Sequence, residues 1–365
     1  MPSHISLFWK KLAGGGIESV MLTLAEEFLA QGLDVDIVLG KRRGELVDEV
    51  PAKANVFDLD VSRTVERFTS LARYLRQQEP DVLLSAGTLS RYAVLGNLVS
   101  GTTTPLVLAV HKPLSLTGSG SRLPKWVFDR FIKWTYPFAD RIIAVSEGVA
   151  DDLASVFSVP RRDIRVIPNP VVGPRVTEQA KQDVSHPWFS DDSPPVTLAV
   201  GRLDKVKGYL TLVRAFAKMR GKRPCRLVIL GEGPRRSAIQ QEARKLGITD
   251  DLSMPGYVSN PFKYMARADV FVLSSKWEGL GNVLIEAMAC GTPVISTDCP
   301  GGPPEVLKRG RFGRLVPVEN PAALASAIEE GLNGEIESAP LSTLERFRRD
   351  KVADQYLDVL SSASA

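Results

Sequence analysis

Residues 277–293 read WEGLGNVLIEAMACGTP and combine a loop with the start of a helix. An apolar run ends near Ser274, glycines follow it, and the spacing predicts a helix that opens near Asn282. The first amides of a helix lack partners within the helix, and the helix dipole makes this end positive. The amides from Gly281 to Val283 are therefore predicted to form an anion site that a diphosphate can approach closely.

Two glutamates flank the predicted anion site. Glu286 lies one turn into the helix, where a carboxylate is suited to accept hydrogen bonds from vicinal ribose hydroxyls. Glu278 precedes the helix and is expected on the other side of the phosphates, where a transferred group would lie. Alternatively, both are solvated carboxylates at a helix end. The flanking glycines and the spacing of the pair favour the binding interpretation.

A second stretch supplies cations. Residues 201–208 read GRLDKVKG and follow an apolar run directly. Arg202 is predicted to donate a bidentate pair of hydrogen bonds to phosphate oxygens. Lys207 is predicted to act as a point charge at the start of the next helix. Taken alone, these are two ordinary charges in a turn. Beside an anion-binding helix, a diphosphate contact is the better interpretation.

Short apolar runs alternate with amphipathic segments along the whole chain, which predicts an α/β architecture with parallel strands. The alternation lapses over residues 173–194, a polar stretch with prolines, and we predict a domain boundary there. Ligands of such sheets lie outside the carboxyl ends of the strands, so two facing sheets predict a cleft between the domains. The predicted strands are 5–8, 35–39, 82–84, 106–110, 141–145, 196–200, 226–230, 270–273, 293–296 and 314–316. The predicted helices are 17–28, 65–76, 125–136, 149–156, 209–219, 235–246, 283–290 and 322–332.

The 365 residues exceed what one core usually holds, which supports two domains. No apolar run approaches the roughly 20 residues of a membrane-spanning helix, and no secretory signal is visible. Three cysteines are too few for a disulfide framework, so we expect a cytoplasmic protein. The three histidines are far apart and no C-x-x-C occurs, so no metal site is expected. A net charge of +4 is too small to favour nucleic acid as a partner.

These segments resemble the signatures of retaining glycosyltransferases of family four, the glycosyl transferases group 1. The pair Glu278 and Glu286 is similar to the family's paired glutamates, and residues 201–208 resemble its G-R-L-x-x-x-K-G element. Two departures occur: residues 300–305 read PGGPPE in place of a single glycine-proline step, and Asn169-Pro170 replaces the commoner Asn-Gly. Other matching segments are residues 15–18, 144–146, 167–170, 231–234, 256–258 and 268–272, with Phe347, Val352 and Tyr356 near the C-terminus.

The resemblance implies an α/β fold of the GT-B class, with two Rossmann-like domains that face each other across a cleft. Residues 1–172 are then the acceptor-side domain and residues 173–345 the nucleotide-sugar domain. Residues 346–365 are expected to form a C-terminal helix that returns to the first domain.

The resemblance also implies roles for single residues. Arg202 and Lys207 would hold the donor diphosphate and stabilise the leaving nucleotide, Glu286 would bind ribose, and Glu278 would contact the donor sugar. His111 would lie near the reacting sugar, although it could instead be a strand-end histidine bonded to a loop. The expected catalytic residues are Arg202, Lys207, Glu278 and His111. The expected donor-binding residues are Gly16, Gly201, Arg202, Lys207, Tyr257, Val258, Glu278, Gly281, Asn282, Val283 and Glu286, with Tyr257 and Val258 near the base.

The function implied is sugar transfer from a nucleotide-diphosphate donor to a glycan or lipid-linked acceptor in polysaccharide or glycoconjugate biosynthesis. Uridine is favoured over guanosine by the resemblance alone, and no cofactor or metal is expected. Two alternatives stay open: a sugar-nucleotide epimerase of the same fold, and a catalytically silent protein that binds nucleotide sugars. The sequence names neither the sugar nor the acceptor.

Residues 122–141 mix basic and aromatic side chains. In one interpretation this segment, from Arg122 to Arg141, lies on an anionic membrane surface near a lipid-linked acceptor, which makes the protein peripheral on the cytoplasmic face. In the other it is a helix packed on the core with an ordinary solvated face.

Overall fold

The computed structural model describes residues 1–61, 64–117, 124–190 and 192–364. They form two compact units, residues 1–170 together with 347–365, and residues 171–346. The domain limits expected at residues 172 and 345 fall within two residues of these boundaries.

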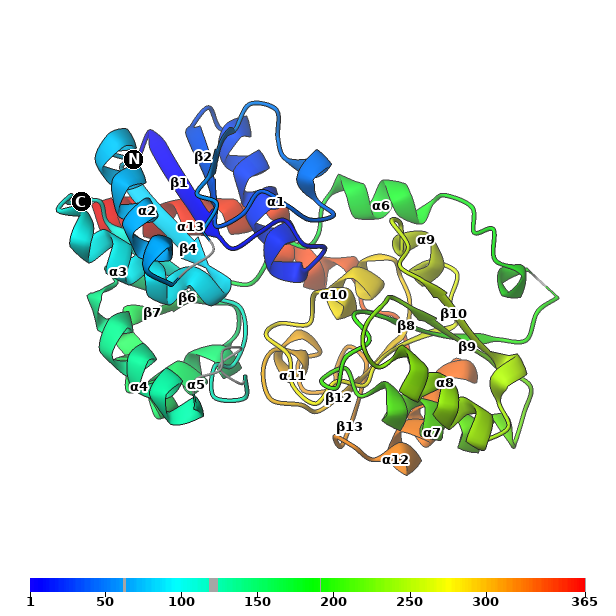
Figure 1. The fold of residues 1–365 in the computed structure, drawn as a ribbon. Helices are drawn as coiled ribbons and strands as arrows, with labels where there is room; N and C mark the ends of the chain where they lie inside the picture. Colours follow the sequence, from blue (N-terminus) through cyan, green and yellow to red (C-terminus); the bar gives the residue numbers. More distant parts are fainter. Residues whose placement is uncertain (62–63, 118–123, 191, 365) are drawn as a thin grey trace. The chain divides into compact units, whose positions relative to one another are not determined.

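Within the described residues, the first unit holds a seven-stranded parallel sheet in the order β3-β2-β1-β4-β5-β6-β7 (Figure 1). The strand β1 lies inside the sheet because Ile5 pairs with both Val35 of β2 and Val82 of β4. Strands β3 and β7 and helix α3 are additions that periodicity did not predict. The strands are β1 His4–Trp9, β2 Asp34–Leu39, β3 Asn55–Asp58, β4 Val82–Ala86, β5 Leu106–Val110, β6 Arg141–Ala144 and β7 Ile164–Val166. The α-helices are α1 Gly16–Ala30, α2 Thr64–Gln78, α3 Ser90–Ser100, α4 Lys125–Thr135, α5 Glu147–Phe157 and α13 Arg349–Ser364.

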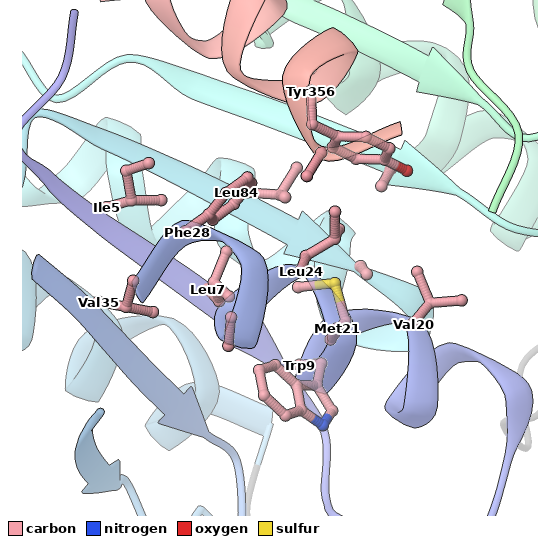
Figure 2. Close-up of a cluster of buried hydrophobic side chains, with 14 of the residues drawn as sticks. Ile5, Leu7, Trp9, Val20, Met21, Leu24, Phe28, Val35, Leu84 and Tyr356 are labelled. Carbon is pink, nitrogen blue, oxygen red and sulfur yellow. The ribbon is translucent and has the colours of Figure 1, made fainter. Parts of the chain in front are cut away.

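The C-terminal helix α13 packs into the core of the first unit, beside α1 and β4 (Figure 1). Its Tyr356 is fully buried in the cluster that joins the apolar face of α1 to β1 (Figure 2). Arg349, at the start of α13, forms ion pairs with Glu26 and Glu27 of α1, the second at 3.0 Å. The last helix therefore completes the first unit although 176 residues of the second unit, 171–346, precede it.

In the part of the chain that the structure describes, the second unit has a six-stranded parallel sheet in the order β10-β9-β8-β11-β12-β13. The sequence predicted no helix in the stretch 173–194, but its described residues include the α-helix α6 and a short 3-10 helix at Pro187–Phe189. Pro174 opens α6 at a position where a missing N–H costs nothing, and Val176 is its buried apolar residue. The strands are β8 Val196–Val200, β9 Arg226–Leu230, β10 Leu252–Gly256, β11 Val270–Leu273, β12 Val294–Thr297 and β13 Arg314–Val316. The α-helices are α6 Pro174–Ala180, α7 Tyr209–Arg220, α8 Arg236–Lys245, α9 Phe262–Met265, α10 Asn282–Ala289, α11 Pro303–Val306 and α12 Pro321–Leu332.

A buried carboxylate ties the first three strands of the first unit to α2. Asp36 of β2 is only 1% exposed. Its Oδ1 accepts a hydrogen bond from Asn55 Nδ2 at 3.0 Å, and its Oδ2 accepts one from the Tyr74 hydroxyl at 2.5 Å. His4 Nε2 lies 2.9 Å from the same Oδ2. Burial, and next the hydrogen bond to Asp36, raise the pKa of Tyr74 well above its usual range, so this hydroxyl stays protonated.

Asp36→Asn is expected to lower the free energy of unfolding by about 2–4 kcal/mol, because an amide has one acceptor oxygen where the carboxylate has two, so it cannot accept from Asn55 on one side and from Tyr74 and His4 on the other. Urea unfolding followed by circular dichroism measures the change. Asp34→Asn, at the exposed start of the same strand, is the matched control and should change stability little. Equal losses in the two variants would contradict a specific contribution from the buried carboxylate.

Candidate functional site

The loop of residues 201–208 connects β8 to α7 and lies against the end of β11. Gly208 has φ +67°, and a Cβ added there would lie 2.0 Å from the carbonyl oxygen of Ser274. The Ser274 hydroxyl in turn donates to the carbonyl oxygen of Lys207 at 2.8 Å. Glycine at 208 is thus required both by the left-handed backbone and by the close approach of the two loops.

Asp204 organises this loop, a function that the sequence interpretation missed. Its Oδ1 accepts from the backbone N–H of Val206 at 2.9 Å and of Lys207 at 3.2 Å. Its Oδ2 accepts from Arg202 through Nε at 2.9 Å and Nη2 at 2.6 Å. The Arg202 side chain is 76% exposed, so Asp204 orients a guanidinium that remains accessible to a ligand. An aspartate two residues before a turn amide is a common turn signal and could have revealed this contact.

Lys207 and Glu278 are brought into direct contact although 71 residues separate them. The Lys207 ammonium lies 2.7 Å from Glu278 Oε1, and the Ser275 hydroxyl donates to the same oxygen at 2.6 Å. Both charged side chains are at most one-fifth exposed. Ser275 was not among the predicted residues, and its place at the end of β11 was the available signal.

The loop at residues 300–302 holds Glu278 from the other side. The Glu278 N–H donates to the carbonyl oxygen of Pro300 at 3.0 Å. Gly301 has φ +112°, and a Cβ there would lie 1.8 Å from the Glu278 carbonyl oxygen. The Pro-Gly-Gly-Pro-Pro sequence thus packs a tight backbone turn against the segment that carries Glu278.

Helix α10 begins where the sequence predicted. Gly281 is its N-cap, with φ +88°, and Asn282 and Val283 form its first turn. Glu286 is half-buried one turn further on. Burial raises the pKa of Glu286 to about 7, and the charges of Lys207 and then Arg175 oppose this rise. The charge of Lys207 therefore acts on both glutamates, and Arg175 of α6 was not predicted to contribute.

Tyr257 and Val258 follow β10 directly, at the same sheet edge as the loops after β8 and β11. The ring of Tyr257 is 58% exposed. The backbone beside it is fixed because the Gly231 N–H donates to the Gly256 carbonyl oxygen at 2.7 Å. Gly201 has φ +148°, and a Cβ there would crowd Lys207 and Tyr209. The structure thus gathers the predicted residues of the second unit at the carboxyl ends of its parallel strands.

Gly16 and His111 belong to the first unit. Gly16 is the exposed first residue of α1. His111 follows β5, and its Nδ1 lies 3.1 Å from Asn169 Oδ1. Burial lowers the pKa of His111 to about 4, against a smaller opposing effect of Asn169. The alternative interpretation, a strand-end histidine bonded to a loop, accounts for the contact of Nδ1. It does not account for Nε2, which is buried without a hydrogen-bond partner.

Neither a cluster of metal-ligating side chains nor a membrane-spanning helix occurs in residues 1–61, 64–117, 124–190 and 192–364, the ranges that the structure describes. Among those residues, no group of three or more His, Cys, Asp or Glu side chains could hold a metal ion. In the same ranges, no helix is long and apolar enough to cross a membrane.

Two family profiles match successive parts of the chain. The profile of Glycosyltransferase Family 4 matches residues 14–172, and that of Glycosyl transferases group 1 matches residues 181–349. The chain belongs to the group 1, family-four glycosyltransferases. It is 29% identical over 330 residues to a Campylobacter jejuni protein. The match covers 87% of this chain and 86% of the relative. That relative is named N-acetylgalactosamine-N,N'-diacetylbacillosaminyl-diphospho-undecaprenol 4-alpha-N-acetylgalactosaminyltransferase.

Solved glycosyltransferases share the fold of this family member. A glycosyltransferase from Rickettsia africae superposes with a TM-score of 0.81 at 17% identity, over 98% of each chain. Anabaena HepE in complex with UDP superposes with a TM-score of 0.76 at 19% identity, over 98% of this chain and 99% of HepE. The predicted GT-B class, with two Rossmann-like domains, is confirmed for this glycosyltransferase.

Proposed function

We propose that this glycosyltransferase moves a sugar from a uridine diphosphate sugar to a glycan or lipid-linked acceptor, with retention of the anomeric configuration and without a metal at the diphosphate. The observation that carries the proposal is the Lys207–Glu278 pair, which lies beside the start of α10 at the carboxyl edge of the second sheet. The name of the Campylobacter relative, which includes diphospho-undecaprenol, supports a lipid-linked acceptor. The UDP complex of HepE supports uridine diphosphate as the nucleotide of the donor.

The proposed chemistry follows from charge. The bond between the anomeric carbon and the diphosphate oxygen breaks, and its electron pair passes to the diphosphate. Lys207, Arg202 and the first amides of α10 are fixed positive groups that would stabilise this developing charge. The acceptor oxygen bonds to the anomeric carbon on the same face, and its proton passes to the leaving phosphate oxygen.

Thermal-shift measurements with UDP-glucose, UDP-galactose, UDP-N-acetylglucosamine, UDP-N-acetylgalactosamine and GDP-mannose test the donor assignment. We expect stabilisation by one UDP-sugar and not by its free sugar. Release of that sugar in slow hydrolysis without acceptor would distinguish a transferase from a silent binding protein. Conversion of the sugar to its epimer would favour the epimerase. Stabilisation by GDP-mannose alone would contradict the uridine assignment.

We also propose that α4 contacts an anionic membrane surface that carries the acceptor. The helix buries Phe128 and Ile132, while Trp126 and Trp134 are 69% and 56% exposed. The Trp134 ring lies 6.0 Å from that of Phe138, which is also half exposed. Helix α4 thus has a buried apolar face and an exposed aromatic face.

The exposed aromatic face of α4 also carries positive charge. Lys125 is paired with Asp129 at 2.5 Å, so Arg130 and Lys133 are the exposed cations that this helix leaves for lipid headgroups. Arg141 is exposed at the start of β6. Arg122 lies outside the described residues.

Flotation of the full chain with phosphatidylcholine vesicles, with and without phosphatidylglycerol, tests this surface. We expect binding to the anionic vesicles only. Arg130→Glu with Lys133→Glu should weaken it by at least about tenfold, since each basic residue near such a surface contributes about 1 kcal/mol. Trp126→Ala with Trp134→Ala should also weaken it. Arg42→Glu with Lys53→Glu, an exposed pair elsewhere in the first unit, is the matched control. Equal binding by all variants, or none by the wild type, would refute the surface.

A further inference from the structure

Two arginines of the first unit, Arg67 and Arg91, share one tyrosine. Arg67 lies in the first turn of α2, and Arg91 and Tyr92 lie in the first turn of α3. The guanidinium carbons of Arg67 and Arg91 lie 5.2 Å and 4.8 Å from the centroid of the Tyr92 ring. Each arginine also donates to the Tyr92 hydroxyl, Arg67 through Nη1 at 3.3 Å and Arg91 through Nη2 at 3.4 Å. Two positive groups therefore converge on one buried side chain.

The packing of α2 on α3 fixes these groups in place. Gly96 lies one turn after Tyr92 on the same face of α3, and a Cβ there would lie 3.1 Å from the carbonyl oxygen of Phe68 in α2. At the other end of the helix pair, Arg76 of α2 donates through Nε to the carbonyl oxygen of Ser100 at 2.6 Å. The two helices are thus held together at both ends, so the guanidinium groups are positioned before any ligand binds.

The positive charge of this pair has no carboxylate to balance it. Among the residues that the structure describes, neither guanidinium group forms an ion pair with an acidic side chain. Burial raises the pKa of Tyr92, but the hydrogen bonds and charges of Arg91 and then of Arg67 outweigh burial and leave the pKa below its usual value. Both arginines are partly exposed. Accessible guanidinium groups without a carboxylate partner favour an anionic ligand.

The place of the two arginines in the fold also suits a ligand. Helices α2, α3 and α4 follow strands β3, β4 and β5, so their first turns lie at the carboxyl edge of the first sheet, where parallel sheets bind their ligands. The Arg91 guanidinium lies 5.5 Å from the ring centroid of Phe128, which belongs to the buried face of α4. An anion held by Arg91 would therefore lie beside the helix whose exposed aromatic face is the proposed membrane surface.

We propose that Arg67 and Arg91 bind the phosphate groups of a lipid-linked acceptor. Such an acceptor carries its phosphates between the hydrocarbon anchor and the sugar, at the level of the lipid headgroups that α4 would contact. Guanidinium groups donate pairs of hydrogen bonds to phosphate oxygens, which makes them well suited to this ligand. The inference rests on the proposed function for the acceptor and for the membrane surface, whereas an anion site at the two arginines depends on neither.

Tyrosine ¹³C spectra of the full chain report on this site directly. The chain has seven tyrosines, so Tyr92→Phe identifies the signal of the shared ring. The probe is geranyl diphosphate, a soluble prenyl diphosphate. Its negative charge beside the hydroxyl should raise the titration midpoint of Tyr92 by at least about one pH unit. A midpoint that does not change at millimolar probe would overturn the site.

The dependence of the Tyr92 signal on probe concentration gives the affinity of each variant. Arg67→Gln and Arg91→Gln should each weaken binding of the probe by at least about tenfold, because each removes a charged donor. Arg91→Lys keeps the charge and should weaken binding less, which separates loss of charge from a disturbed helix contact. Arg73→Gln removes an exposed arginine of α2 and is the matched control. Lys207→Ala, in the second unit, should also leave the Tyr92 response unchanged. Equal affinity in the wild type and both Gln variants would overturn the assignment.

A short-chain lipid separates the two sources of a phosphate group. Dihexanoylphosphatidylglycerol below its critical micelle concentration should move the Tyr92 signal less than geranyl diphosphate at the same concentration. An equal or stronger response to the lipid would assign the site to a membrane headgroup and overturn the acceptor.

Thermal shifts with UDP-sugars distinguish failure of this inference from failure of the proposed function. A Tyr92 response to the probe without binding of any nucleotide sugar would refute the proposed function and leave the anion site standing. Binding of a UDP-sugar without a Tyr92 response to the probe would overturn the anion site alone.

Discussion

Lys207→Ala is expected to lower kcat at saturating donor by about 100-fold, because loss of one well-placed group that stabilises a developing anion commonly costs about that much. The ammonium of Lys207 is held 2.7 Å from Glu278, so it is already oriented before the donor arrives. Its removal also leaves a mostly buried carboxylate without its cation. Initial rates with the UDP-sugar selected by thermal shift, over a range of donor concentrations, separate kcat from KM.

Two companion variants sharpen this experiment. Arg202→Ala should lower kcat by about tenfold, a smaller loss because its exposed guanidinium is more strongly screened by water than Lys207. Lys205→Ala removes an exposed lysine from the same loop and should leave kcat nearly unchanged. Full activity in both Lys207→Ala and Arg202→Ala would refute the assignment of the diphosphate site.

The raised pKa of Glu286 predicts that donor binding depends on pH. Ribose hydroxyls donate to a carboxylate, so the ionised form should bind the donor best. With a pKa of about 7, the ionised fraction rises about tenfold between about pH 6 and pH 8, and donor affinity should rise with it. Calorimetry with a UDP-sugar measures this directly, because the phosphates of a sugar diester do not titrate in this range. Glu286→Gln should bind more weakly at pH 8 and lose the pH dependence.

The same carboxyl group links stability to pH with the opposite sign. Its pKa is about 4.5 as the reference value and about 7 in the folded chain, so the folded state holds the proton more tightly between these values. The contribution of Glu286 to the free energy of unfolding should therefore be greatest below about pH 4.5 and should fall as the pH rises through 7. For a half-buried side chain we expect this loss to be about 1–3 kcal/mol.

Glu286→Gln should remove that loss of stability. Urea unfolding at several pH values measures it, and Glu337→Gln, at an exposed position, is the control. A wild type and Glu286→Gln with parallel pH profiles would contradict the raised pKa.

Much of the fold was predictable because the spacing of apolar residues within a helix or strand indicates which of its faces is buried. The apolar face of α1 and the continuous apolar run of β5 are examples, since a helix repeats its buried face every 3.6 residues and a strand buried on both faces is apolar throughout. Elements with little apolar signal escaped. Strand β3 has no buried residue, and α6 has only one.

The candidate site was predictable in residue type more than in contacts. Arg202, Lys207, Glu278 and Glu286 were identified from spacing and resemblance, and their functions in binding remain predictions. Asp204 and Ser275 escaped because their importance lies in the partner of each side chain, Arg202 in one case and Glu278 in the other.

The sequence alone determined the alternating α/β elements, the glycine-rich starts of α7 and α10, and the charged residues beside them. Only the tertiary structure decided that Lys207 meets Glu278, that His111 meets Asn169, and that Tyr356 of α13 fills the core of the first unit. The reason is strand order. Local periodicity specifies which side of an element is buried, but the loops after β8 and β11 become neighbours only because these two strands pair although residues 201–269 lie between them in the chain.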